Sequence, residues 1–166
     1  MNVLSVSDVS KSYNMGQNNR QMVLKNINLE IREGEFVSIM GPSGSGKSTL
    51  LYNISGMDKP DLGKIDFAGR DLMKEKEEEL SKLRLIKMGF IFQQSNLLKN
   101  LNLFDNIILS AYLAKGETRA SVNARALDLM QKMGVSELKD NDITQASGGQ
   151  LQRVAICRAL INQPDI

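Results

Sequence analysis

The sequence predicts an α/β protein, and three observations along its 166 residues support this prediction. Short apolar runs with the two-residue period of β-strands occupy the N-terminal part, at residues 3–6, 23–31 and 63–69. A glycine-rich loop at residues 41–48 lies between a strand-like run and an apolar run that favours a helix. Between residues 122 and 133, apolar side chains instead recur with the spacing of an amphipathic helix. We therefore expect a β-rich core followed by helices.

The remaining elements are predicted from local signals. Residues 35–40 form an apolar run that enters the glycine-rich loop, and residues 88–92 form another that ends at Gln93. Both runs have the length and composition of strands. Thr118 is expected to cap the helix that follows it, because its hydroxyl can accept a hydrogen bond from a free backbone amide. Gly134 is placed to end that helix.

Composition narrows the classes of protein to which the chain can belong. A chain of 166 residues with 42% hydrophobic residues is long enough for one domain with a sizeable core. The formal net charge is +2, and basic residues are interspersed with acidic ones, so we expect no nucleic-acid partner. The sequence has no apolar run long enough to span a membrane. Its N-terminus also lacks the basic region followed by an apolar region that is typical of a signal peptide. It therefore predicts a cytoplasmic protein.

Cysteine and histidine usage limits the chemistry. Cys157 is the only cysteine, so no internal disulfide can form, and its helical, apolar surroundings predict a buried residue. The sequence contains no histidine. Acid–base catalysis or metal binding by histidine is therefore excluded within these residues.

The glycine-rich loop fills the pattern G-x-x-x-x-G-K-[ST], which binds nucleotide phosphates. Lys47 is expected to reach the β and γ phosphates, Ser48 to bind Mg²⁺, and Thr49 to support the first turn of the helix. The alternative is a chance match in a flexible loop, but the strand, loop and helix order favours a phosphate site. The residues predicted to bind nucleotide here are Gly41, Ser43, Gly44, Ser45, Gly46, Lys47, Ser48 and Thr49.

A second candidate anion site precedes the amphipathic residues 151–160. Ser147, Gly148, Gly149 and Gln150 stand at the entrance of that predicted helix. The free amides, the serine hydroxyl and the helix dipole would all favour a phosphate there. The alternative is an ordinary serine N-cap followed by glycines that permit the turn.

Together these residues resemble the ATP-binding subunit of ABC transporters. The glycine-rich loop is similar to that family's Walker A motif, and Ser147-Gly148-Gly149-Gln150, here called the signature segment, is similar to its signature motif. Phe92-Gln93 resembles its Q-loop, and Lys11-Ser12-Tyr13 its adenine-stacking loop. Finer similarities, including residues 34–40, point to the branch that serves lipoprotein release, macrolide export and antimicrobial-peptide resistance.

The resemblance implies a P-loop NTPase core with an antiparallel β subdomain in residues 1–96, a helical subdomain in residues 97–141, and the signature segment with its helix in residues 142–166. It also implies a head-to-tail dimer, with ATP between Lys47 of one subunit and the signature segment of the other. Tyr13 would stack on adenine. Gln93 would contact Mg²⁺ and the attacking water, so Lys47 and Gln93 are the expected catalytic residues. Further partners would be transmembrane permease subunits, which would hold the chain peripherally on the inner face of the cell membrane.

The sequence departs from the family's pattern after residues 162–166. Family members continue into an apolar strand that ends in Asp-Glu, and then to a histidine, none of which this sequence contains. Because positioning and electrostatic stabilisation supply most of the catalysis of phosphoryl transfer, we expect no appreciable ATP hydrolysis. We also expect a core that lacks its C-terminal strands, with exposed sheet edges as a consequence.

Three other functional hypotheses compete with that of a transporter ATPase. A small-molecule kinase would explain the glycine-rich loop but has no need of the signature segment. An ABC-type ATPase of DNA repair would contain long heptad repeats between the two motifs, and this sequence has none. A noncatalytic nucleotide-binding or interaction fragment is the third alternative. The membrane subunits choose the transported substrate in this family, so the sequence does not identify it.

Overall fold

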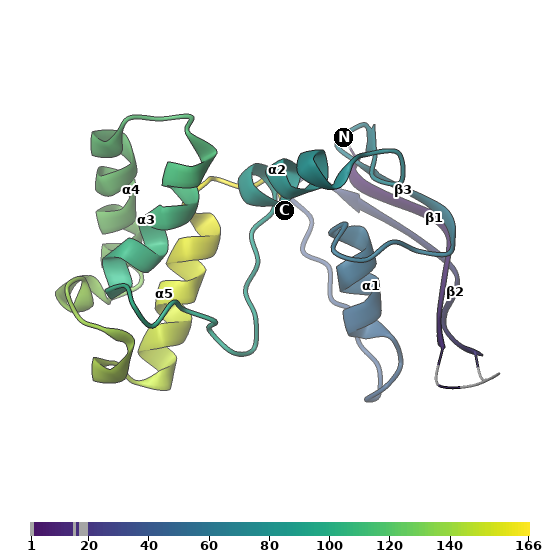
Figure 1. Cartoon of the computed structure of the whole chain (residues 1–166), viewed down its shortest axis with the longest axis horizontal. Helices are drawn as coiled ribbons and strands as arrows, with labels where there is room; N and C mark the ends of the chain where they lie inside the picture. The colour runs from purple at the N-terminus through teal and green to yellow at the C-terminus, as the bar shows by residue number, and fades with distance from the viewer. Residues whose placement is uncertain (1, 15, 17–19) are drawn as a thin grey trace. The chain divides into compact units, whose positions relative to one another are not determined.

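An antiparallel sheet forms the N-terminal part of the computed structural model, which describes residues 2–14, 16 and 20–166 (Figure 1). The chain divides into two units, Met1–Ser81 and Lys82–Ile166. The sheet of the first unit has the order β2-β1-β3-β4, and every recorded pairing is antiparallel. Its strands are β1 (Asn2–Asn14), β2 (Arg20–Arg32), β3 (Leu62–Phe67) and β4 (Arg70–Asp71).

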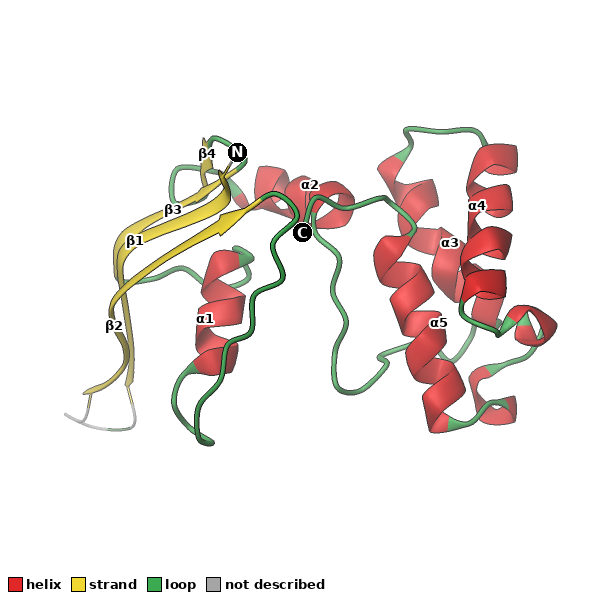
Figure 2. Cartoon of the chain, turned by 180° about the vertical axis from the view of Figure 1, so that it is seen from behind, coloured by secondary structure: helices red, strands yellow, loops and turns green. Residues whose placement is uncertain are grey.

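Alternating apolar residues explain why these segments pair. Leu4 lies opposite Phe67, and Val6 lies opposite Ile65, so the buried side chains of β1 and β3 fall on one face. Helix α1 (Lys47–Ile54) lies beside the sheet, as Figure 2 shows. The predicted strands at residues 3–6 and 23–31 are thus confirmed. Of the strand predicted at residues 63–69, residues 63–67 are confirmed.

The second unit is helical. It contains α3 (Leu103–Ala114), α4 (Arg119–Lys132) and α5 (Gly148–Leu160), with the short 3₁₀ helices η1 (Ser136–Leu138) and η2 (Ile143–Gln145), while α2 (Glu77–Lys87) spans the boundary between the units. The core of this unit is formed by fully buried apolar side chains of the three long helices, among them Ile107, Ala126, Met130, Val154 and Cys157.

The predicted ends of α4 are confirmed. The hydroxyl of Thr118 accepts a hydrogen bond from the amide of Ser121, and Gly134 follows the C-cap Met133 with a left-handed φ of 63°. Burial of Cys157 is confirmed as well, and desolvation raises the pKa of its thiol to about 11. The predicted domain boundaries after residues 96 and 141 remain predictions.

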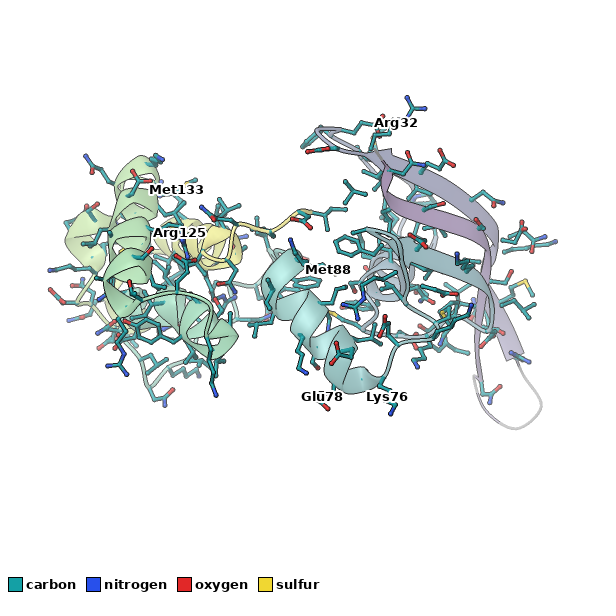
Figure 3. The ribbon with its side chains drawn as sticks, turned by 90° about the horizontal axis from the view of Figure 1, so that it is seen from above. Arg32, Lys76, Glu78, Met88, Arg125 and Met133 are labelled. Carbon is teal, nitrogen blue, oxygen red and sulfur yellow. The ribbon has the colours of Figure 1, made fainter. Side chains whose placement is uncertain are left out.

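Two of the predicted strands are wrong. Residues 35–40 and 88–92 belong to no helix or strand, and Phe36 and Met40 are 98% and 86% exposed. The physical reason is that a strand is defined by its neighbours, and neither segment has a full ladder partner in the described chain. The residues on either side of Met88 (labelled in Figure 3) form backbone hydrogen bonds with the last residues of the chain: Ile166 N donates to Lys87 O at 3.4 Å, and Gly89 N to Ile166 O at 2.8 Å.

None of the helices in the described part of the chain is both long and apolar enough to cross a membrane.

Candidate functional site: two helix N-termini and a tethered tyrosine

The predicted phosphate loop has a backbone that depends on glycine. Gly44 and Gly46 have φ values of 79° and 90°, in the left-handed region that side chains disfavour. Gly46 also has no room, because a Cβ there would lie 3.0 Å from the carbonyl oxygen of Val23 and 3.2 Å from Leu24. The loop is therefore packed against β2, and Gly46 forms the N-cap of α1.

The first turn of α1 has backbone amides that the helix itself does not use. The first bond of the helix is donated by Leu50 N to Gly46 O at 2.8 Å, so the amides of Lys47, Ser48 and Thr49 precede the regular ladder. The first turn carries no acidic side chain. These amides and the positive end of the helix dipole can together bind an anion.

Lys47 folds back over the loop. Its Nζ donates to Gly41 O at 2.9 Å and to Pro42 O at 2.7 Å, and lies 3.4 Å from Ser45 Oγ. These partners are neutral, and within the described residues Lys47 has no ion pair. Its positive charge is therefore available to a phosphate group that enters the loop.

Tyr13 lies near the end of β1, in the same unit as the loop, and is 37% exposed. Its hydroxyl donates to Asp58 Oδ2 at 2.7 Å, and the Nζ of Lys11 lies 5.1 Å from its ring centroid. The hydrogen bond to Asp58 raises the pKa of Tyr13. Tyr13 and the predicted phosphate loop thus belong to the same unit.

Asp58 connects the turn after α1 to β1. It forms an ion pair with Lys11 at 2.7 Å, and the same Nζ donates to Lys59 O at 2.6 Å. Burial of Asp58 favours its neutral form, but the hydrogen bonds from Lys11 and Tyr13 outweigh burial and hold the pKa of Asp58 below its ordinary value.

Asp61 makes a second connection to β1. It accepts hydrogen bonds from Ser12 N at 2.9 Å, Ser12 Oγ at 2.6 Å and Arg20 Nη2 at 2.7 Å. The bonds from Ser12, and then that from Arg20, lower the pKa of Asp61 to about 2. Sequence reasoning missed both aspartates, because their partners are remote in the chain. The one local signal was the polar turn that contains them.

The signature segment forms the N-terminus of α5. Ser147 N donates to Gln150 Oε1 at 2.7 Å and Gln150 N to Ser147 Oγ at 3.3 Å, which is a capping box. The first turn has no acidic residue, and a Cβ added at Gly148 or Gly149 would meet nothing within 4 Å. The capping role considered from sequence is therefore present, and the turn is also open to an approaching anion.

Gln93 lies in an exposed loop of the second unit. The carbonyl of the preceding Phe92 accepts a hydrogen bond from Gln152 Nε2 of α5 at 3.0 Å. Arg158 of the same helix donates to Ser95 O and Asn96 O at 2.7 and 2.8 Å. The structure thus brings the Gln93 loop and α5 together.

Residues 24–166 match the ABC transporter family. This chain belongs to that family. The chain is 41% identical over 159 residues to the lipoprotein-releasing system ATP-binding protein LolD of Bdellovibrio bacteriovorus, an alignment that covers 96% of this chain and 71% of that protein. It is 40% identical over 166 residues to the bacitracin export ATP-binding protein BceA of Halalkalibacterium halodurans, covering 100% of this chain and 65% of BceA.

A third ABC relative has its permease in the same polypeptide. This is the macrolide export ATP-binding/permease protein MacB of Syntrophobacter fumaroxidans, 38% identical over 167 residues, which cover 100% of this chain and 23% of MacB. A dimeric ATP-binding cassette solved with ADP and Pi superimposes with a TM-score of 0.89 at 41% identity, over 97% of this chain and 70% of that one. The predicted family, its branch and the α/β cassette fold are confirmed.

The residues of this ABC chain fit Mg²⁺ as part of a nucleotide complex. Mg²⁺ prefers oxygen ligands and often binds through substrate phosphates with few protein groups. Ser48, at the start of α1, offers such an oxygen, whereas the described residues contain no group of three Asp, Glu, His or Cys side chains that could hold a metal by themselves. The metal is therefore expected to bind together with phosphates.

Proposed function

We propose that this chain is the ATP-binding subunit of an export-type ABC transporter and that it binds Mg-ATP through the loop at residues 41–49. One observation carries the proposal: free amides at the start of α1 and the Lys47 ammonium belong to the same loop, and the ammonium has only neutral partners. The names of LolD, BceA and MacB, which refer to release and export, support the direction of transport.

Four of the predicted site residues have separate roles in this proposal. Lys47 exchanges its loop carbonyls for phosphate oxygens, Ser48 supplies a hydroxyl to Mg²⁺, and Tyr13 offers a partly exposed ring to adenine. Gln93 orients water and contacts Mg²⁺. The bound Mg²⁺ would neutralise charge on the phosphates.

A second copy of the chain completes the site in this proposal. Ser147, Gly148, Gly149 and Gln150 of one copy would bind the phosphates that Lys47 of the other copy holds. The open turn at the start of α5 supports this arrangement, as does the dimeric state of the related cassette. Permease subunits are the remaining partners, and they would keep the chain peripheral to the inner face of the membrane.

Nucleotide binding without turnover is the second candidate. The observation that favours it is that residues 88–104, which include Gln93, contain no carboxylate, and the sequence has no histidine. A group able to accept a proton from water is therefore not provided by this loop.

The proposal is tested by calorimetric titration of the chain with Mg-ATP, together with a phosphate-release assay. Lys47→Ala is expected to weaken binding about 10–100-fold, because a charge-assisted hydrogen bond is worth about 1.5–3 kcal/mol. Lys25→Ala is the matched control, since Lys25 is an exposed lysine of the same unit outside the loop. Equal binding by Lys47→Ala and the unsubstituted chain would refute the proposal. Phosphate release by the unsubstituted chain would exclude the second candidate.

A further inference from the structure

Helix α5 carries two polar side chains that its anion-binding end does not use. Gln152 and Arg158 both turn toward the loop that contains Gln93. Their three hydrogen bonds reach carbonyls on both sides of it: Gln152 Nε2 donates to Phe92 O at 3.0 Å, and Arg158 donates to Ser95 O at 2.7 Å and Asn96 O at 2.8 Å. The loop is therefore fixed at its entrance and at its exit.

No ion pair within the described residues accounts for the position of the Arg158 side chain. Its guanidinium is partly buried, and desolvation lowers its pKa, yet in the part of the chain that the structure describes it has no acidic partner. An arginine fork gives each of two neighbouring carbonyls its own nitrogen donor in a fixed plane, whereas a lysine offers a single nitrogen on a flexible stem. One of the two carbonyls belongs to Asn96, whose φ of 48° is in the left-handed region, so the fork holds a sharp turn in place.

We propose that Arg158, assisted by Gln152, is a positioning residue for Gln93. It fastens the loop at residues 92–96 to the helix that begins with the signature segment, so that Gln93 and Ser147 move as one body. The tether itself depends only on contacts within the second unit. The consequence for nucleotide binding rests on the proposed function, because it requires Gln93 to contact Mg²⁺.

Backbone order parameters from nuclear magnetic resonance test the tether directly. In the unsubstituted chain, residues 93–96 are expected to be nearly as rigid as the helices, with values of about 0.85. Arg158→Lys keeps the charge but loses the fork, and should lower them below about 0.6. The amides of α5 should not change, nor should Leu98, whose amide is held by Asn106 Oδ1 at 2.7 Å.

Two further variants make the test specific. Gln152→Leu removes only the bond to Phe92 O, so increased motion should be confined to residues 92 and 93. Arg119→Lys is the matched control, because its guanidinium lies 5.5 Å from the Tyr112 ring in the same unit and donates to no loop carbonyl among the described residues. If Arg158→Lys does not fold, the unsubstituted chain and Gln152→Leu decide the question.

The role of the tether in nucleotide binding is tested by measuring the affinity for ATP once with Mg²⁺ and once with EDTA. The ratio of the two affinities is the gain that Mg²⁺ provides. Arg158→Lys should reduce this gain about as much as Gln93→Ala does, while the affinity for ATP in EDTA stays unchanged. An unchanged gain in a loosened loop would overturn the positioning role.

Other results would overturn the tether itself. These are a loop that is already mobile in the unsubstituted chain, a loop that stays rigid in both variants, or loosening of the whole of α5 in Arg158→Lys, which would mark a general structural role. Absence of ATP binding by the unsubstituted chain would refute the proposed function instead, and the order parameters would still judge the tether.

Discussion

At the scale of single residues, two of the glycines of the glycine-rich loop, Gly44 and Gly46, differ in one respect that can be measured. Gly44 has open space where a Cβ would be, whereas Gly46 faces the Val23 carbonyl at 3.0 Å. Alanine at either position costs about 1–2 kcal/mol for the left-handed backbone. Only Gly46→Ala adds a clash, which costs about 1–3 kcal/mol more. We expect Gly46→Ala to lower the urea midpoint clearly more than Gly44→Ala. Equal losses would show that the loop is not packed against β2.

Asp58 is the residue on which the position of Tyr13 depends. Asp58→Asn leaves Lys11, whose side chain is only 10% exposed, without an anionic partner. We expect a loss of about 1–3 kcal/mol in the free energy of unfolding, measured in urea. Affinity for ATP should fall about fivefold, with affinity for inorganic triphosphate unchanged, because only the adenine contact is disturbed.

A matched variant is Asp66→Asn in the same unit. Asp66 forms a longer ion pair, 3.4 Å, with Lys64, whose side chain is 55% exposed. Such surface pairs contribute little to stability. A stability loss as large in Asp66→Asn as in Asp58→Asn would argue against a special role for the Asp58 contact.

At the scale of elements, one arginine joins the start of α4 to the end of α5. Arg125, labelled in Figure 3, donates to both oxygens of Glu117 at 2.8 and 2.7 Å and to Ile161 O at 2.7 Å. Hydrogen bonds from Arg125, then from Ser121, lower the pKa of Glu117 to about 2 from 4.5. Arg125 therefore links Glu117, just before α4, to Ile161, at the end of α5.

The depressed pKa of Glu117 predicts how stability depends on pH. A group whose pKa is lower in the folded state stabilises the fold above its unfolded pKa and loses that contribution as the pH falls through the folded value. Stability of the unsubstituted chain should therefore fall between about pH 4.5 and pH 2, and fall less in Glu117→Gln, as measured by chemical denaturation at each pH. Glu137→Gln, an exposed glutamate without an ion pair in the described chain, should follow the unsubstituted curve.

Elements with local signals were predicted correctly, including the strands at residues 3–6 and 23–31, whereas the strands predicted at residues 35–40 and 88–92 were not found. The cap at Thr118 and the stop at Gly134 depend on neighbouring residues, so sequence alone located them. Residues 35–40 have the composition of a strand, but composition does not supply the neighbouring strand that they need. The same limit applies to the site. The residues of the glycine-rich loop are contiguous, so sequence alone could single them out, whereas the contacts of Asp58 and Arg158 join residues far apart in the sequence.

At the scale of the whole molecule, the two units have the same kind of feature. Each presents a helix N-terminus without an acidic residue in its first turn, α1 in the first unit and α5 in the second. Only α1 has a lysine folded over the turn, from Lys47. The two ends are thus complementary: one can hold a nucleotide phosphate tightly, and the other can bind the exposed side of a phosphate that is already held.

The proposed head-to-tail dimer predicts complementation between two defective chains. Lys47→Ala removes the cation at α1. Ser147→Asp keeps a good helix cap at α5 but places a negative charge where the phosphate would bind. A dimer of either variant has two damaged sites. A mixed dimer has one site damaged twice and one intact, because Lys47 of the Ser147→Asp chain meets Ser147 of the Lys47→Ala chain.

Mixing the two variants should therefore restore association that depends on Mg-ATP, measured by sedimentation velocity, when neither variant associates alone. About half of the dimers in an equimolar mixture would be mixed if pairing were random, so the restored signal should be substantial but incomplete. A mixture that associates no better than its components would mean that Lys47 and Ser147 act on the same nucleotide within one chain or not at all. Because Ser147→Asp preserves the cap, loss of α5 would not explain that failure.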